Sequence, residues 1–139
     1  MRKLAPLLVG VIGLLLATGV PGGAVAAEPD AAQGPIVVTL AVGSEKYRIK
    51  LVETDDIDGA FRLLRGDPSA PRIPLGLVVR PDPDVNIGYH WHIDPLDFTG
   101  AEHTIELCDG APSAVERGEV SGSYYCPWTA KVISIVPAR

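Results

Sequence analysis

The feature that most constrains this chain is a pair of cysteines, Cys108 and Cys126, downstream of a segment with the pattern of an export signal. Exported proteins enter oxidising compartments, where two thiols of one chain persist as a disulfide. Such a bridge would add roughly 3 kcal/mol of stability by restricting the unfolded chain. We therefore predict a disulfide between Cys108 and Cys126, and the alternative is two free thiols, one of them buried in a strand.

The amino-terminal segment has the charge and hydropathy order of a secretory signal peptide. A short basic start precedes an apolar run, Leu4–Val20, which is followed by small residues. This order predicts a signal peptide over residues 1–26, with cleavage after Ala26 or, as second choice, after Ala27, and therefore a secreted, extracellular protein. The alternative is an uncleaved membrane anchor, but proline and glycine interrupt the run, which is short for a span of about 20 residues. We expect no membrane insertion after cleavage.

Charge narrows the range of partners. The net charge is −5, and it becomes about −7 after cleavage because Arg2 and Lys3 leave with the signal peptide. The remaining chain has no basic run and no stripe of Lys and Arg. Nucleic acids and anionic membranes are bound through such basic surfaces, so we expect neither as a partner. The excess of Arg over Lys, with abundant Ala, Gly and Pro, indicates a GC-rich bacterial source.

The pattern of apolar residues predicts a single α+β domain over residues 36–139, preceded by a flexible leader over residues 27–35. Its expected core is a mainly antiparallel sheet of five to six strands, with two short helices and one disulfide. The expected strands cover residues 36–42, 46–52, 75–80, 89–93, 103–108 and 129–136. The first two of these strands are expected to form a hairpin. The expected helices run from Thr54 to Gly66 and from Asp109 to Gly118.

The segment 89–94 has the highest density of chemically versatile side chains. On a strand, residues two apart point the same way, so His90, His92 and Asp94 would share one face. Trp91 would then point to the core. Two histidines with a nearby carboxylate can ligate a divalent metal ion. The favoured interpretation is simpler: one histidine hydrogen-bonds a loop backbone and the other is solvated.

A second cluster, Tyr124–Trp128, surrounds Cys126. An aromatic side chain beside a disulfide can cover the bridge and exclude water, and we expect this core role for Trp128. An exposed Tyr124 or Tyr125 would be the better contact for a partner. In the alternative, Tyr124 and Trp128 are both interface anchors.

Four short motifs resemble a family of small domains named for the amino-terminal domain of a eukaryotic calmodulin-binding protein. They are His92–Pro95, Ile105–Gly110, Pro112–Glu116 and Tyr125–Trp128, and the likeness covers most of residues 46–136. The resemblance implies a fold, a disulfide and a small exported protein or module. It also implies that His92, rather than His90, has the general role, orienting a loop through Asp94 or a backbone carbonyl.

Calmodulin itself is not expected as a partner. Calmodulin binds basic amphipathic helices, whereas the expected helix over residues 56–65 is short and begins with acidic residues. The family resemblance therefore does not carry calmodulin binding over to this chain.

Together these patterns predict an exported, disulfide-stapled binding or interaction module for an unknown protein or small ligand. Loops on a stapled scaffold would carry recognition, and the residues predicted to bind are His90, Trp91, His92, Asp94, Tyr124 and Trp128. The alternative function is a metal-binding protein or metal-dependent hydrolase that uses His90, His92 and His103. No serine lies in a nucleophile motif, so we assign no catalytic residue, metal or other cofactor, and an enzyme is the less favoured class.

Overall fold

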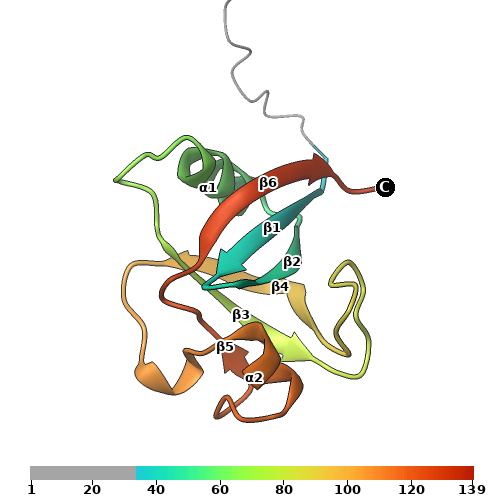
Figure 1. Ribbon diagram of the computed structural model, residues 1–139. Coiled ribbons are helices and arrows are strands. Elements are labelled where there is room, and N and C mark those ends of the chain that lie inside the picture. The colour runs from blue at the N-terminus through green and yellow to red at the C-terminus, as the bar shows by residue number, and fades with distance from the viewer. Residues whose placement is uncertain (1–33) are drawn as a thin grey trace, which may run out of the picture.

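The protein is described by a computed structural model over residues 34–139, shown in Figure 1. The predicted signal peptide, residues 1–26, and nearly all of the predicted leader, residues 27–35, lie outside the described residues. The elements are β1 (Ile36–Val42), β2 (Glu45–Leu51), α1 (Thr54–Leu64), β3 (Ile73–Val79), β4 (His92–Ala101), the 3₁₀ helix η1 (Glu106–Cys108), α2 (Pro112–Glu116), β5 (Tyr124–Tyr125) and β6 (Lys131–Pro137).

The first sheet has the strand order β2-β1-β6 and is antiparallel throughout. β1 and β2 form the predicted hairpin, whose turn contains Gly43 with φ 60°, a conformation that favours glycine. Every second residue of β1 is buried, as expected for a strand with one face on the core. The carboxyl-terminal strand β6 pairs with β1, so the two ends of the described chain lie in neighbouring strands.

The second sheet has the order β4-β3-β5, again antiparallel. Gly76 of β3 lies at its centre, opposite Phe98 of β4 and Tyr125 of β5. A Cβ atom at Gly76 would clash with the side chain of Ile93, so the close approach of β3 and β4 depends on glycine.

The prediction of one five- to six-stranded sheet is wrong, because the six strands are divided between two three-stranded sheets. The predicted strand 89–93 begins only at His92, since the preceding residues are turns held by the buried side chain of Asn86. This amide accepts a hydrogen bond from the backbone of Arg48 (2.9 Å) and donates one to the carbonyl of Trp91 (3.0 Å). The predicted strand 103–108 is instead irregular backbone followed by η1.

Both predicted helices are present, with different starts. α1 begins at Thr54 after Glu53, and no side chain caps it. α2 begins at Pro112, three residues after the aspartate that was expected to cap it, and it ends before Gly118, whose φ is 72°.

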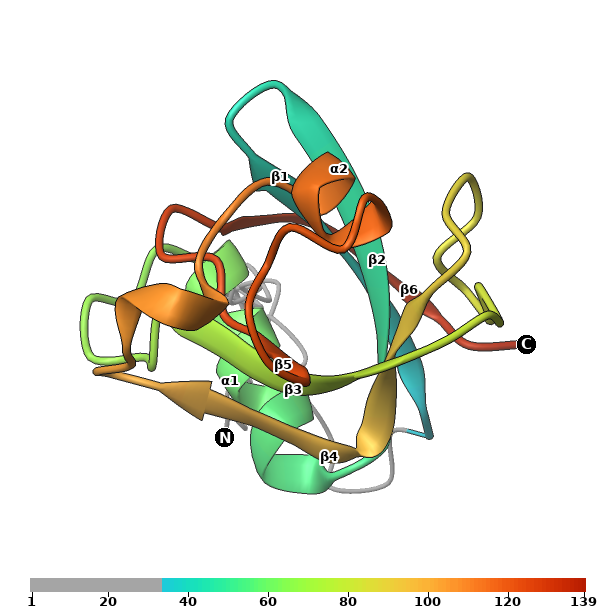
Figure 2. The same cartoon turned by 90° about the horizontal axis from the view of Figure 1, so that it is seen from below.

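The core contains residues of both sheets and of both helices, including Val38, Ile49, Ile57, Trp91 and Val115. α1 lies beside β6, and α2 lies at the other end of the molecule near β5 (Figure 1). Seen from below, β3 and β4 cross under β1 and β2 (Figure 2). No helix within residues 34–139 is long and apolar enough to cross a bilayer.

Candidate functional site

Four aromatic rings fill the space between the two sheets at the end near α2. Tyr47, Tyr89, Trp91 and Tyr125 have ring centroids 5.4 to 5.9 Å apart in the contacting pairs. Burial raises the pKa of the Tyr47 phenol well above its usual value. The Tyr125 hydroxyl donates to the carbonyl of Gly110 (2.8 Å), and burial raises its pKa as well. The rings pack against one another, and they fix the segment that carries the predicted histidine site.

The structure does not bring the two neighbouring histidines to a common site. His90 lies in a turn, where its backbone N–H (3.0 Å) and its Nδ1 (2.6 Å) both contact the carboxylate of Glu116. His92 begins β4, and its Nδ1 lies 2.6 Å from the carbonyl oxygen of Asp82. The second contact joins the start of β4 to a loop through a backbone carbonyl, which is the kind of contact predicted for His92.

Asp94 and His103 also act separately from these two histidines. The carboxylate of Asp94 accepts a local hydrogen bond from the backbone of Leu96 (2.9 Å). His103 is exposed beyond the end of β4. Within residues 34–139, no three His, Cys, Asp or Glu side chains gather in a group that could hold a metal ion.

Glu116 is the residue that sequence reasoning missed in this region. The backbone N–H of His90, and then its ring, stabilise the carboxylate and lower the pKa of Glu116. Glu116 ends α2, so this contact ties the turn before β4 to that helix.

The second predicted cluster is divided by the disulfide between the core and the surface. Tyr125 is buried, while Tyr124 and Trp128 are each 41% exposed. The predicted core role of Trp128 is therefore wrong, because Tyr125 instead fills the core. The Tyr124 hydroxyl donates to Asp97 (2.8 Å), and this bond raises the pKa of the phenol.

The predicted disulfide is present, and it positions Trp128. Cys108 and Cys126 are bridged, with Cα atoms 5.0 Å apart, and the backbone N–H of Cys126 donates to the carbonyl of Cys108 (2.7 Å). Two residues later, the backbone N–H of Trp128 donates to Asp109 (2.9 Å). The indole N–H donates to Thr104 (2.7 Å). The bridge thus joins two loops and holds a half-exposed indole between them.

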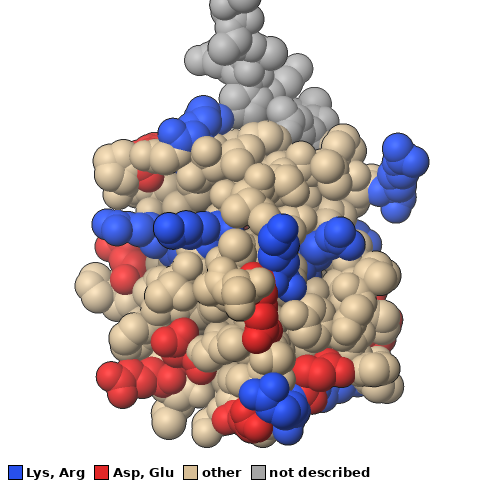
Figure 3. All heavy atoms as spheres, in the orientation of Figure 1, with Lys and Arg blue, Asp and Glu red and all other residues tan. Residues whose placement is uncertain are grey.

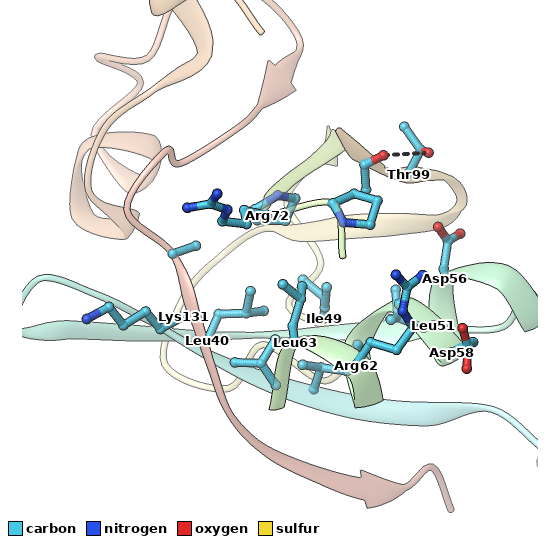
Figure 4. Close-up of a pocket in the computed structure, with 18 of the residues that line it drawn as sticks. Leu40, Ile49, Leu51, Asp56, Asp58, Arg62, Leu63, Arg72, Thr99 and Lys131 are labelled. Carbon is cyan, nitrogen blue, oxygen red and sulfur yellow. Dashed lines mark hydrogen bonds between the residues drawn. The ribbon is translucent and has the colours of Figure 1, made fainter. Parts of the chain in front are cut away.

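The main hollow of the described surface is an open cleft between α1, β6 and the ends of β3 and β4 (Figure 4). Its volume is about 1070 Å³. The walls come from α1, residues 66–74, residues 98–100 and residues 128–132, and the floor includes Leu40, Ile49 and Leu51 of the first sheet. Ligand pockets are typically mostly apolar clefts of this size with a few polar groups. We call this hollow the α1 cleft.

Of the six predicted binding residues, only Trp128 lines the α1 cleft. Sequence reasoning missed the rest of the site because its residues come from four separate segments. One signal was available: Gly59 lies inside α1, where glycine costs about 1 kcal/mol relative to alanine. A Cβ atom at Gly59 would meet nothing within 4 Å. The missing side chain leaves the wall of the cleft open.

The wall formed by residues 66–74 is ordered by a polar network. Arg62 of α1 donates from Nε to the carboxylate of Asp67 (2.9 Å) and from a terminal nitrogen to the hydroxyl of Ser69 (2.7 Å). Asp67 also accepts hydrogen bonds from the backbone and hydroxyl of Ser69 (2.8 and 2.7 Å). The Ser69 hydroxyl and Arg62 hold the pKa of Asp67 well below its usual range. The loop after α1 is thereby tied back to the helix.

Asp56 lies at the other wall, and its electrostatic surroundings are different. Burial, and then the charges of Glu53 and Asp55, raise the pKa of the Asp56 carboxyl, although a hydrogen bond from the backbone of Gly100 opposes the shift. A cationic group placed beside Asp56 would relieve this repulsion. The other polar side chains of the cleft are Asp, Arg, Lys and Thr, and the lining residues in the described part include no Ser, Cys or His. This arrangement is suited to holding charged groups.

The outer surface gives a less specific pattern. On the face shown in Figure 3, Lys and Arg are spread across the middle and upper parts, and Asp and Glu lie mainly below them. The two signs are interspersed, so this face offers no broad surface of one charge.

Comparison with known proteins assigns a family to the chain. The family model that describes the BP-74 N-terminal domain matches residues 35–139. No curated protein and no solved structure matches the chain significantly.

Proposed function

The chain belongs to the BP-74 N-terminal domain family, and from this premise we propose that it is an exported, disulfide-stapled binding module whose ligand occupies the α1 cleft. The observation that carries the proposal is the cleft itself, with a volume of about 1070 Å³ and an apolar floor. Its rim carries a few charged side chains and the half-exposed indole of Trp128. Such a combination provides burial for a ligand together with groups that fix its orientation.

The proposal moves the recognition surface from the two predicted loops to the α1 cleft. His90 and His92 are engaged by Glu116 and by the carbonyl of Asp82. Trp91 is fully buried, so its part is to support the fold. Trp128 joins the predicted surface to the cleft, and Tyr124 remains available at the adjoining surface as a partner contact.

The first experiment asks whether the α1 cleft is a binding site. The probe is 1-anilinonaphthalene-8-sulfonate, which combines an apolar body with an anionic group. We expect saturable binding to the folded protein, reported by the fluorescence of the probe. Gly59→Phe would fill the cleft from α1, where a new side chain meets open space, and should abolish binding.

Gly34→Phe is the matched control, since it places the same side chain in open space away from the cleft. Circular dichroism should show that both variants are folded. Equal binding of the probe to wild type and to Gly59→Phe would exclude the cleft as the binding site.

The export and disulfide parts of the proposal are tested by native mass spectrometry of protein purified from an exporting host without chelator. We expect the mass of a chain that begins at Ala27 and lacks the two thiol hydrogens of Cys108 and Cys126. One metal ion per chain would instead favour the alternative function, and His92→Ala would then test whether that metal is lost.

A further inference from the structure

The two ends of the α1 cleft carry opposite charge. Figure 4 shows Asp56 and Asp58 at one end and Arg72 and Lys131 at the other. The side chains between them are apolar: Leu40, Ile49 and Leu63. Asp58, Arg72 and Lys131 are exposed, so a ligand in the cleft can reach them. A complementary ligand has a cation at one end, an anion at the other and an apolar middle.

Arg62 also lines the cleft near the acidic end, but it does not cancel the acidic charge. Its guanidinium is engaged by Asp67, with Nε 2.9 Å from the carboxylate, and by Ser69. This pair is neutral as a unit. Asp55, Asp56 and Asp58 therefore leave the acidic end of the cleft with a net negative charge.

Two of the strands that contribute to the walls are at the edges of their sheets. β4 is the outer strand of the order β4-β3-β5, and β6 is the outer strand of the order β2-β1-β6. Thr99 and Gly100 of β4, and Lys131 and Val132 of β6, line the cleft. Edge strands leave backbone N–H and C=O groups without a ladder partner. Such groups bind extended peptides by adding a strand.

We propose that the α1 cleft binds a short linear peptide with free ends. Its amino group contacts Asp56 and Asp58, its carboxylate contacts Arg72 and Lys131, and its apolar side chains cover Leu40, Ile49 and Leu63. This inference rests on the proposed function, because it names the ligand class of the same cleft.

A peptide fits these observations better than other ligands with two charges. In a free amino acid the two charges are adjacent, whereas the charged groups here lie at opposite ends of a cleft of about 1070 Å³. A fatty acid or other anionic lipid has an apolar body and an anionic head but no cation for the acidic end. A short peptide with apolar side chains has both charges, an apolar middle and a backbone that can pair with an edge strand.

The probes are pools of pentapeptides made from Ala, Val, Leu and Phe, in four forms: free ends, an acetylated amino end, an amidated carboxyl end, and both ends blocked. Affinity is measured by isothermal titration calorimetry on the mature, disulfide-bonded protein. Exposed ion pairs are individually weak, so blocking one end should weaken binding roughly two- to fivefold.

Two charge-removing variants assign the orientation of the peptide. Asp58→Asn should lose the effect of acetylation and keep the effect of amidation. Lys131→Gln should show the reverse. Glu106→Gln and Lys46→Gln are matched controls on exposed residues outside the cleft, and they should keep both effects.

Equal affinity for the free and the doubly blocked pools would overturn the proposal, as would the same loss of sensitivity in the control variants. Blocking of the fluorescent probe by Gly59→Phe separates the two levels of inference. If that probe binds in the cleft and no peptide pool does, the peptide proposal fails and the binding function stands. If neither binds, both fail.

Discussion

Residues of both sheets surround two very different regions of this domain. Near α2, four aromatic rings fill the space between the sheets, and Trp91 has no exposed surface. Beside α1, small residues such as Gly59, Pro71 and Ala130 line the α1 cleft, which stays open. The comparison indicates how one small core is divided: the aromatic cluster stabilises the fold, and the cleft leaves surface for a ligand. Substitutions in each region can test this division.

The largest effect is expected from Trp91→Ala. Truncating this fully buried ring leaves a cavity among three tyrosines and should lower the free energy of unfolding by about 3–5 kcal/mol. The matched variant is Trp128→Ala at the cleft, where the indole is 41% exposed and the loss should be about 1 kcal/mol or less. Urea unfolding measures both. Similar losses would show that the two regions do not differ as described.

The double variant Cys108→Ala and Cys126→Ala should follow. The bridge spans a sequence separation of 18 residues, and loop-closure entropy gives a loss of roughly 3 kcal/mol. Urea unfolding of the double variant beside the oxidised wild type measures this loss. A difference below about 1 kcal/mol would indicate that local hydrogen bonds hold these loops without the bridge.

Two glycines give a matched pair of opposite sign. Gly76→Ala would push a methyl group into the side chain of Ile93 and should destabilise the protein by about 1–3 kcal/mol. Gly59→Ala adds a methyl group in open space on a helix and should stabilise it by about 0.5–1 kcal/mol. Thermal unfolding of both variants checks the signs. Destabilisation by Gly59→Ala would mean that the wall of the cleft is closed at this position.

The smallest effects are opposite pH dependences. Glu116 near the aromatic cluster has a lowered pKa, so the stability it contributes is present above its ordinary pKa of about 4.3 and is lost as pH falls through the folded value. Asp56 at the cleft has a raised pKa, so its contribution is present below about 3.9 and is lost as pH rises through the folded value.

Urea unfolding across acidic pH measures these slopes with Glu116→Gln and Asp56→Asn. Relative to wild type, Asp56→Asn should become more favourable as pH rises, and Glu116→Gln less favourable. Slopes of the same sign would contradict the assigned surroundings of one of the two carboxyl groups.

How far the sequence predicts the structure depends on the range of the interactions involved. The hairpin of β1 and β2 and the helix α1 follow from apolar periodicity and turn residues over a few positions, and they were predicted nearly as observed. The segment 89–94 was misjudged, because its alternation resembles a strand. Its actual path depends on Asn86, whose hydrogen bonds reach Arg48 in a different strand.

The candidate site shows the same limit more strongly. Trp128 and Tyr125 are similar in sequence context, and one is half exposed while the other is buried. The choice depends on which ring packs against Tyr47 and Trp91, and those residues are distant in the chain. The α1 cleft could not be predicted, since its charged ends come from α1, from the following loop and from the start of β6.

The sequence by itself determined the family, the disulfide partners and most of the secondary structure, because these depend on short motifs, on there being only two cysteines and on local periodicity. The tertiary structure decided the division into two sheets, the separation of His90 from His92 and the position of the cleft. The physical reason is that burial and charge pairing are properties of contacts between distant segments. Those contacts exist only once the chain has packed.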